Sequence, residues 1–302
     1  MNSLSRESRK GTASKVISET DLILNPDGSV YHLKLRPEDV SPTVITVGDP
    51  DRVGAVSKYF DRVDHKVRRR EFVTHTGELG GKRITVASTG MGTDNVEIFL
   101  TELDALVNVD LETRTVRKKK TSLQIIRIGT SGALQKDIPL DSHLISHFAI
   151  GLDNLVQFYD FRMTGKELSI SEQLTSHLGL PLKPYVVSGS KALMTQVGQG
   201  MLPGNTLTMP GFYAPQGRIV RLRPKYGRLL DDLASFAYGK TNGGFRLTNF
   251  EMETAGYYSL GRLLGHQMVS TNAIIAHRIY KKFSRNPSKL VDSLIRRVLE
   301  NI

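Results

Sequence analysis

Short apolar runs recur along the chain, and each is followed by a glycine-containing turn and then by an amphipathic stretch. The run at 43–50 precedes a helical pattern at 51–60. The run at 83–92 precedes the segment 95–107, in which apolar residues recur at positions 96, 99, 100, 103, 106 and 107. Spacings of three and four are typical of one face of a helix, whereas a continuous apolar run bounded by turns is typical of a buried strand. The pattern therefore predicts alternating strands and helices.

The same alternation continues through the rest of the chain. Further buried strands are predicted at 122–132, 142–150, 184–190 and 266–276. Two more helices are predicted, one at 250–265 that ends at Gly265 and one at 287–302 that begins at Pro287 and Ser288. Strands that alternate with helices pair in parallel beneath helical layers, so we expect an α/β architecture. Ligands of such proteins bind at the carboxyl ends of the strands, where these glycine turns fall.

Two segments stand apart from this pattern. Residues 1–30 show little periodicity and are predicted to form an N-terminal extension, which begins basic and rich in hydroxyl groups. Residues 108–122 carry many charges and are predicted to be an exposed connection. Neither an internal repeat nor a shift in composition divides the remainder, so residues 31–302 are predicted to form a single domain.

The composition of the 302 residues, 39% hydrophobic and 24% charged, is that of a globular protein. No run approaches the roughly 20 apolar residues that a membrane span needs, so we expect no membrane role. The chain has no cysteine, which excludes disulfides, thiol nucleophiles and cysteine-based zinc sites, and a cytoplasmic location is the simplest expectation. The net charge of +11 raises nucleic acid as a partner, but only Tyr280 and Phe283 interleave aromatic rings with the basic clusters. We therefore expect no nucleic-acid function, because charge runs are usually solvated faces.

Glycine turns accompanied by arginines carry the main chemical signal. Gly48 is followed by Arg52 in the first turn of a predicted helix, and Arg127 lies inside an apolar strand that ends in Gly129 and Thr130. Backbone N–H groups, a hydroxyl and converging guanidinium groups are the set that binds phosphate. A buried arginine needs an anionic partner in any case, so a structural salt bridge between Arg127 and a local glutamate is the alternative. The P-loop motif is absent, and "GMGTDN" lacks the third glycine of a dinucleotide fingerprint.

Two further pairs of polar residues are candidates for ligand contacts. Glu251 and Glu253 flank Met252 near a predicted helix start, and their spacing does not place them on one helical face. Such a pair suits acid–base chemistry, a metal site or the recognition of sugar hydroxyls, whereas stabilisation of the helix dipole is the alternative. Gln216 and Arg218 lie one residue apart on an aromatic segment broken by proline and glycine. An amide beside a guanidinium needs a polar partner if it lies near apolar surface.

Six stretches in order carry a resemblance to a known family. They cover roughly residues 31–280 and are "VGDPDRV" (47–53), "RREF" (69–72), "STGMGTDN" (88–95), "RIGTSGAL" (127–134), "FYAPQGR" (212–218) and "NFEMET" (249–254). Together they resemble the nucleoside phosphorylase superfamily, and most closely its uridine phosphorylase branch. The resemblance implies a three-layer α/β/α sandwich around a mixed, mostly parallel twisted sheet. It also implies a homo-oligomer, either a dimer or a hexamer of dimers.

The resemblance implies roles for the matched residues. Phosphate would be held by Gly48, Arg52, Arg127 and Thr130, and by Arg70 of a neighbouring subunit. The nucleoside would be held by His32, Phe212, Gln216, Arg218, Glu251, Met252 and Glu253. Within this set, Gln216 and Arg218 would contact the uracil edge, Glu253 would accept from the ribose hydroxyls, and His32 would cross a dimer interface to the 5′-hydroxyl. Arg127, Gln216 and Arg218 would be the catalytic residues.

The implied reaction converts uridine and phosphate to uracil and ribose 1-phosphate, with phosphate as co-substrate and no cofactor. The stretch 271–278 has no aspartate, the residue with which purine phosphorylases protonate the base, and this favours a pyrimidine. A potassium ion near Glu71 is implied by some relatives, but Met91 and Asn95 differ from the usual neighbours, so the ion stays open. Residues 277–290, where the family often carries a flap over the base, match poorly. A purine nucleoside phosphorylase, a nucleosidase and a non-catalytic nucleoside-binding protein are the alternatives.

Overall fold

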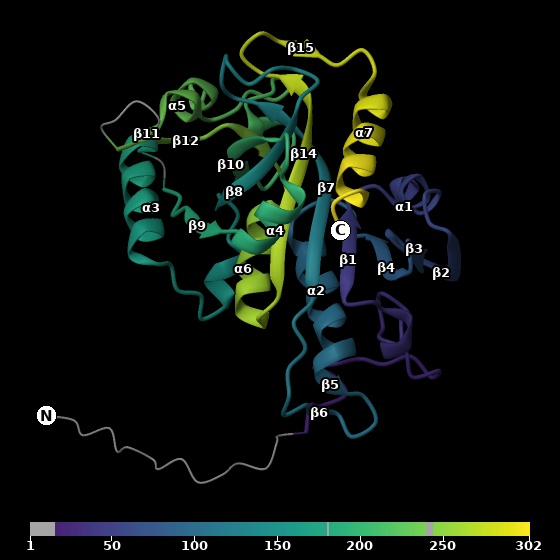
Figure 1. Ribbon diagram of the computed structural model, residues 1–302. Helices are drawn as coiled ribbons and strands as arrows, with labels where there is room; N and C mark the ends of the chain where they lie inside the picture. The colour runs from purple at the N-terminus through teal and green to yellow at the C-terminus, as the bar shows by residue number, and fades with distance from the viewer. Residues whose placement is uncertain (1–15, 180, 240–243) are drawn as a thin grey trace, which may run out of the picture.

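The protein is built around one large mixed sheet (Figure 1). The computed structural model describes residues 16–179, 181–239 and 244–302. The strands of the large sheet are β1 (Thr43–Val47), β2 (Arg62–Arg69), β3 (Phe72–Leu79), β4 (Lys82–Ser88), β7 (Gln124–Ala133), β8 (His143–Gly151), β9 (Tyr185–Ser188), β10 (Leu202–Thr208), β13 (Asn249–Glu251), β14 (Gln267–His277) and β15 (Lys282–Phe283). Two small hairpins are β5 (Val109–Asp110) with β6 (Thr115–Val116), and β11 (Ala237–Tyr238) with β12 (Phe245–Arg246).

The described helices cover the sheet. The α-helices are α1 (Pro50–Ser57), α2 (Thr93–Asn108), α3 (Gly165–Leu178), α4 (Lys191–Val197), α5 (Leu229–Ser235), α6 (Thr254–Leu264) and α7 (Pro287–Leu299). Three short 3-10 helices are η1 (Pro37–Asp39), η2 (Leu155–Phe158) and η3 (Ala214–Gln216). Figure 1 shows α1 and α7 on one side of the sheet, α2 and α6 near the lower ends of β7 and β14 in this view, and α3 and α5 beside β8, β9 and β10.

Parallel pairs form the centre of the sheet, and hairpins form its margin. β1 lies between β4 and β7 and pairs with both in parallel. β7 also pairs with β14 in parallel and with β13 in antiparallel fashion. Because β14 pairs with β8, and β10 joins β8 to β13, these five strands close into a ring. The strands β2, β3 and β4 form antiparallel hairpins at the other margin.

Successive residues of the central strands face opposite helical layers. Val44 of β1 packs in a core with α2 and α6, whereas Ile45 and Val47 pack in a second core with α1 and α7. Ile125 and Ile126 of β7 divide in the same way. This alternation is what a strand buried on both faces requires, since side chains of a strand point to alternate sides. The predicted three-layer α/β/α fold with a central mixed sheet is thereby confirmed.

The helix that was predicted from residue 250 begins later, at Thr254. Phe250 and Glu251 belong to β13, a strand of three residues that pairs with β10 and β7. Three residues are too few to show the alternation by which a strand is detected in sequence. The correction matters for the site, because β13 places Glu251 at the end of a strand, and Glu253 lies between that strand and α6.

Residues 108–122 are more than the exposed connection that was predicted. They contain the hairpin of β5 and β6, and Asn108 and Val109 at its start are buried. The side chain of Arg114, in the turn of this hairpin, donates hydrogen bonds to the backbone carbonyls of Ile17, Ser18 and Leu22. The described part of the N-terminal extension is therefore fastened to the body, whereas residues 1–15 lie outside the described residues.

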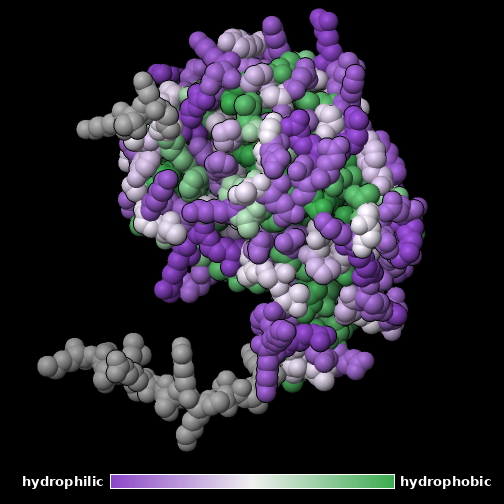
Figure 2. Space-filling view, in the orientation of Figure 1, coloured by the Kyte–Doolittle hydropathy of each residue, from purple (hydrophilic) through white to green (hydrophobic). Residues whose placement is uncertain are grey.

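Hydrophilic side chains cover most of the face drawn in Figure 2, with hydrophobic side chains in patches between them. The basic run 117–120 is exposed along its whole length, as expected of a solvated charge run. Among the described residues, none of the helices has the length and apolar character needed to cross a membrane.

Candidate active site

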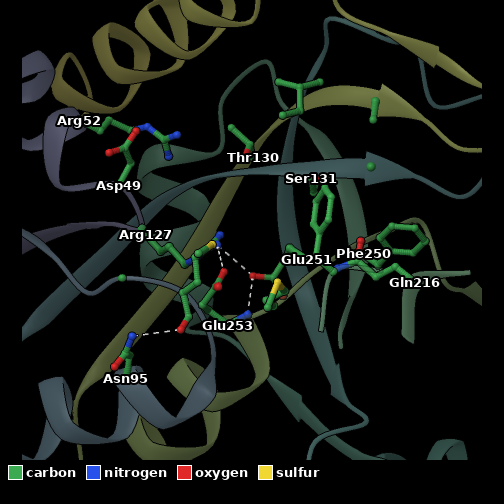
Figure 3. Close-up of a pocket in the computed structure, with 18 of the residues that line it drawn as sticks. Asp49, Arg52, Asn95, Arg127, Thr130, Ser131, Gln216, Phe250, Glu251 and Glu253 are labelled. Atoms are coloured by element: carbon green, nitrogen blue, oxygen red, sulfur yellow. Dashed lines mark hydrogen bonds and ion pairs between the residues drawn. The ribbon is translucent and has the colours of Figure 1, made fainter. Parts of the chain in front are cut away.

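A cavity of about 630 Å³ opens where several strands of the sheet end (Figure 3). Gly48 follows β1, Thr130 lies near the end of β7, and Glu251 ends β13. The carboxyl ends of these strands therefore bring together segments that are far apart in sequence, as expected for an α/β fold. The predicted site residues that line the cavity are Gly48, Arg52, Glu71, Arg127, Thr130, Phe212, Gln216, Arg218, Glu251, Met252 and Glu253.

One end of the cavity carries Arg52 and the start of α1. Asp49 caps this helix by accepting the backbone N–H of Asp51 at 3.0 Å, and Arg52 lies in its first turn. The Arg52 guanidinium donates to the carbonyl of Ile128 at 3.3 Å. Burial lowers the pKa of Arg52, although the nearby Asp49 carboxylate acts in the opposite direction. A largely desolvated guanidinium at a helix N-terminus favours an anion in this part of the cavity.

Arg127 lies in the middle of the cavity, between this end and the end that holds Phe250 and Gln216 (Figure 3). It is 4% exposed, and its Nη2 lies 2.5 Å from a carboxylate oxygen of Glu253 and 3.1 Å from one of Glu251. Burial opposes the charged form, but the two carboxylates outweigh it and raise the pKa of Arg127. The alternative for Arg127, a salt bridge with glutamate, is therefore present, but with glutamates that are distant in sequence, and it lies on the wall of the cavity.

A glycine makes room for this arginine. Arg127 and Gly129 point to the same side of β7 because they are two residues apart on one strand. A Cβ atom at position 129 would overlap Nη1 of Arg127 and lie 2.6 Å from its Cζ. The sequence Arg-Ile-Gly is thus required by the path of the arginine side chain along the strand.

The two glutamates differ in their surroundings. The Glu251 carboxylate accepts the Thr208 hydroxyl at 2.7 Å and the backbone N–H groups of Glu253 and Thr254, so it stabilises the first turn of α6. Glu253 accepts the N–H of Gly92 at 2.8 Å in addition to its bond with Arg127. Burial raises the pKa of Glu253, and Arg127 opposes that rise. The oxygens of Glu251 are therefore largely occupied by donors from the protein, whereas the Glu253 carboxylate has fewer protein donors.

The other end of the cavity holds the amide and the guanidinium of the segment 212–218. Gln216 is 3% exposed, and its Oε1 accepts a hydrogen bond of 2.6 Å from Nη1 of Arg218. The same nitrogen donates to the carbonyl of Phe212 at 2.6 Å, and the guanidinium lies 3.7 Å from the centre of the Phe212 ring. Burial, with a contribution from the neighbouring Arg278, lowers the pKa of Arg218 to about 10.

Arg278 contacts two residues of this end and was not identified from the sequence. Its Nη2 donates to the carbonyl of Gln216 at 3.3 Å, and its guanidinium lies 5.7 Å from the centre of the Phe250 ring. Phe250 and Phe283 also line the cavity without having been predicted. Arg278 directly follows the end of β14. This position was the available signal, because cavity residues such as Gly48 also follow strand ends.

His32 and Arg70 lie outside the cavity of their own chain. The His32 ring and backbone bind Glu102 of α2, and Arg70 is exposed in the two-residue turn between β2 and β3, where its φ is 55°. The resemblance assigns both residues to the site of a neighbouring subunit, so their roles stay predictions. Within residues 277–290, the hairpin from β14 to β15 brings Phe283 to the cavity, and α7 begins at Pro287.

This arrangement of residues is accompanied by a match to a known family. The model of the family described as the phosphorylase superfamily matches residues 42–300. The chain belongs to the phosphorylase superfamily. The family predicted from the ordered motifs is thereby confirmed.

Relatives within the phosphorylase superfamily include enzymes named for pyrimidine and for purine nucleosides. Uridine phosphorylase of Thermococcus kodakarensis is 28% identical over 266 residues, which cover 87% of this chain and 83% of the relative. A DeoD-type purine nucleoside phosphorylase of Alkaliphilus metalliredigens is 26% identical and covers 78% of this chain and 82% of the relative. The solved structure of a Trypanosoma brucei nucleoside phosphorylase, whose title states that it shows uridine phosphorylase activity, has a TM-score of 0.84 at 27% identity. That match covers 93% of this chain and 100% of the other.

The potassium ion that the resemblance implies near Glu71 stays a prediction. Asn95 turns its Nδ2 toward the carbonyl of Met91 and donates to it at 3.1 Å. That nitrogen fills the space beside Gly90, where a Cβ would lie 2.7 Å from it. Hard cations take oxygen ligands, and here the amide N–H satisfies the carbonyl. The described residues contain no group of three or more His, Asp or Glu suited to a metal ion, so no step below uses one.

Proposed function

We propose that this protein catalyses the reversible phosphorolysis of uridine to uracil and ribose 1-phosphate. The observation that carries the proposal is one cavity with two different ends. Arg52 and Thr130 lie at one end, and Gln216 and Arg218 at the other. An anion at the first end and a base at the second would place a ribose between them, beside Glu253. The proposal draws support from the relatives named for uridine, whereas the relatives named for purine nucleosides keep the purine alternative open.

The phosphate end would supply the nucleophile. A phosphate oxygen attacks C1′ of the ribose as the bond between C1′ and N1 of uracil breaks, and the electron pair of that bond leaves with the base. Arg52 and Arg127 would orient the phosphate, and the negative charge of the phosphate would lie beside the developing positive charge of the sugar. Glu253, held by Arg127, would accept hydrogen bonds from the ribose hydroxyls. Positioning and electrostatics then account for the rate without a cofactor.

The base end would stabilise the leaving group. Uracil gathers negative charge on its oxygens as it departs, and it takes a proton after the bond has broken. Arg218 presents N–H donors to the cavity, and Arg278 binds the backbone carbonyl of Gln216. The Oε1 of Gln216 is occupied by Arg218, which leaves the amide N–H groups of Gln216 for a ligand. Hydrogen bonds to oxygens that become negative strengthen in the transition state, so they accelerate the reaction rather than merely bind the substrate. No aspartate occupies residues 271–278 to protonate a purine.

A homo-oligomer belongs to this proposal. Arg70 would complete the phosphate site of a neighbouring subunit, and His32 would reach the 5′-hydroxyl there, because neither lines the cavity of its own chain. We place the reaction in pyrimidine salvage and in the cytoplasm, which the absence of cysteine fits.

The decisive experiment measures uracil release from uridine with and without phosphate, alongside inosine, adenosine and thymidine. Phosphate-dependent release from uridine, with at least tenfold lower turnover of the purines, is the expected result. Release without phosphate would indicate a nucleosidase, and preference for inosine or adenosine would indicate a purine phosphorylase. If nucleosides bound to the protein but none was turned over, the protein would be a nucleoside-binding protein, and the proposal that it is an enzyme would be refuted.

A further inference from the structure

The carboxylate of Glu102, in α2, accepts hydrogen bonds from two consecutive residues of the segment before β1. The carboxylate accepts the backbone N–H of His32 at 2.9 Å, the backbone N–H of Leu33 at 2.9 Å and the ring Nδ1 of His32 at 2.6 Å. Glu102 itself is 7% exposed. Burying a carboxylate is costly unless donors satisfy it, and three donors from a single segment do so here. This cluster was not anticipated from the sequence, because the two partners are 70 residues apart.

The contact determines which nitrogen of His32 carries the proton. A carboxylate can only accept hydrogen bonds, so the ring must place its proton on Nδ1 to make the bond of 2.6 Å. In the neutral ring, Nε2 then has a free lone pair and acts as an acceptor. The ring plane is fixed as well, since Tyr31 and Phe72 contact the ring edge to face, with centroids 4.8 Å and 6.5 Å away.

The fixed ring does not line the cavity of its own chain. Phe72, which contacts the ring, directly follows Glu71, and Glu71 lines the cavity. The His32 side chain is nevertheless 27% exposed, whereas Leu33 beside it is fully buried. A buried carboxylate that orients a partly exposed imidazole is typical of a histidine that is kept in one tautomer for a ligand.

We propose that Glu102 is a positioning residue, which holds His32 as the Nδ1–H tautomer so that Nε2 accepts a hydrogen bond from the nucleoside 5′-hydroxyl in a neighbouring subunit. This inference rests on the proposed function. It adds a chemical requirement at the sugar, because an acceptor nitrogen favours a hydroxyl, which donates, over a phosphate ester, which at neutral pH accepts. The site would thereby favour nucleosides over their 5′-phosphates.

The test compares uridine with 5′-deoxyuridine, which lacks the hydroxyl in question. The Glu102→Gln variant has one carbonyl oxygen for the three donors and cannot hold the ring as the carboxylate does. We expect kcat/KM for uridine to fall about tenfold, the equivalent of one hydrogen bond, and kcat/KM for 5′-deoxyuridine to change less than twofold. Glu97→Gln, on the same helix and bound to the Tyr159 hydroxyl, is the matched control and should leave both values unchanged. An equal loss of kcat/KM for both substrates would show that Glu102 only supports the fold.

Two further measurements complete the test. In a His32→Ala background the Glu102→Gln substitution should no longer change the ratio of the two kcat/KM values, because the two residues act as a unit. A persistent change of that ratio would refute action through His32. Long-range ¹H–¹⁵N spectra of the oligomer at pH 8 should show the Nδ1–H tautomer for His32 in the parent protein and a mixture in Glu102→Gln. The same tautomer in both would overturn the inference. Absence of uridine turnover would refute the proposed function alone, and the spectra would still decide the role of Glu102.

Discussion

Replacing Arg218 with alanine tests the assignment of the base end. The substitution removes a guanidinium that bonds Oε1 of Gln216 and the carbonyl of Phe212, both at 2.6 Å, and that stacks 3.7 Å from the centre of the Phe212 ring. It therefore removes a cation next to the departing base and also releases the Gln216 amide. The backbone turn at Gly217 stays, because its hydrogen bonds are made by the main chain.

The two consequences differ in size. Loss of one donor to a developing anion costs about 2.7–4 kcal/mol, or roughly 10²–10³ in kcat. Loss of the stacking contributes about 0.5–2 kcal/mol at a partly exposed position, and it affects stability rather than rate. Arg218 is half-buried and Gln216 can turn to a new partner, so the free energy of unfolding should fall by only about 1 kcal/mol. The rate effect should thus exceed the stability effect by a clear margin.

The assay measures kcat and KM for uridine separately, together with thermal unfolding. We expect kcat to fall at least a hundredfold for Arg218→Ala with a modest change in KM, and added guanidinium ion should restore part of the rate. Arg223→Ala removes an exposed arginine from the same loop and serves as the matched control. If Arg218→Ala turned over uridine like the parent protein, the assignment of Gln216 and Arg218 to the base would be wrong even with the family correct.

Three further predictions concern other parts of the structure. Gly129→Ala places a Cβ against the Arg127 guanidinium, so KM for phosphate should rise at least tenfold in steady-state assays; an unchanged KM would remove Arg127 from the phosphate site. Burial opposes ionisation of Glu167, but Arg262, which bonds both carboxylate oxygens, lowers its pKa to about 2. This stabilisation is present above the unfolded pKa near 4.5 and is lost as pH falls toward 2, so Glu167→Gln should cost about 3 kcal/mol in urea unfolding at pH 7 and progressively less below pH 4.5. A penalty independent of pH would contradict this account. Arg114→Ala removes the bonds to the backbone of residues 17–22, and limited proteolysis should then cut the N-terminal segment faster while uridine turnover stays within twofold; equal proteolysis rates would show that other contacts hold the segment.

The central strands and their helices were predictable from the sequence because their signal is local. The apolar run at 43–50 contains β1 and the first residue of α1, and the spacing in 95–107 corresponds to most of α2. The arginine and glycine of β7 and the amide–guanidinium pair of the segment 212–218 were identified as candidates for the same reason, since each motif lies within a few residues. Two strands were not predicted because their local signal is weak: β2 alternates only between exposed and half-buried positions, and β13 has only three residues.

Contacts between distant segments decided the rest. The sequence left open whether Arg127 binds phosphate or a glutamate, and the fold places it against Glu251 and Glu253, more than 120 residues away, on the wall of a cavity. Arg278 and Glu102 could not be assigned from their neighbours, because their partners Gln216 and His32 are 62 and 70 residues distant. Side-chain periodicity follows from the backbone geometry of a few successive residues, and the sequence contains it. The meeting of charges at strand ends depends on the order in which the strands pair, and only the tertiary structure determines that order.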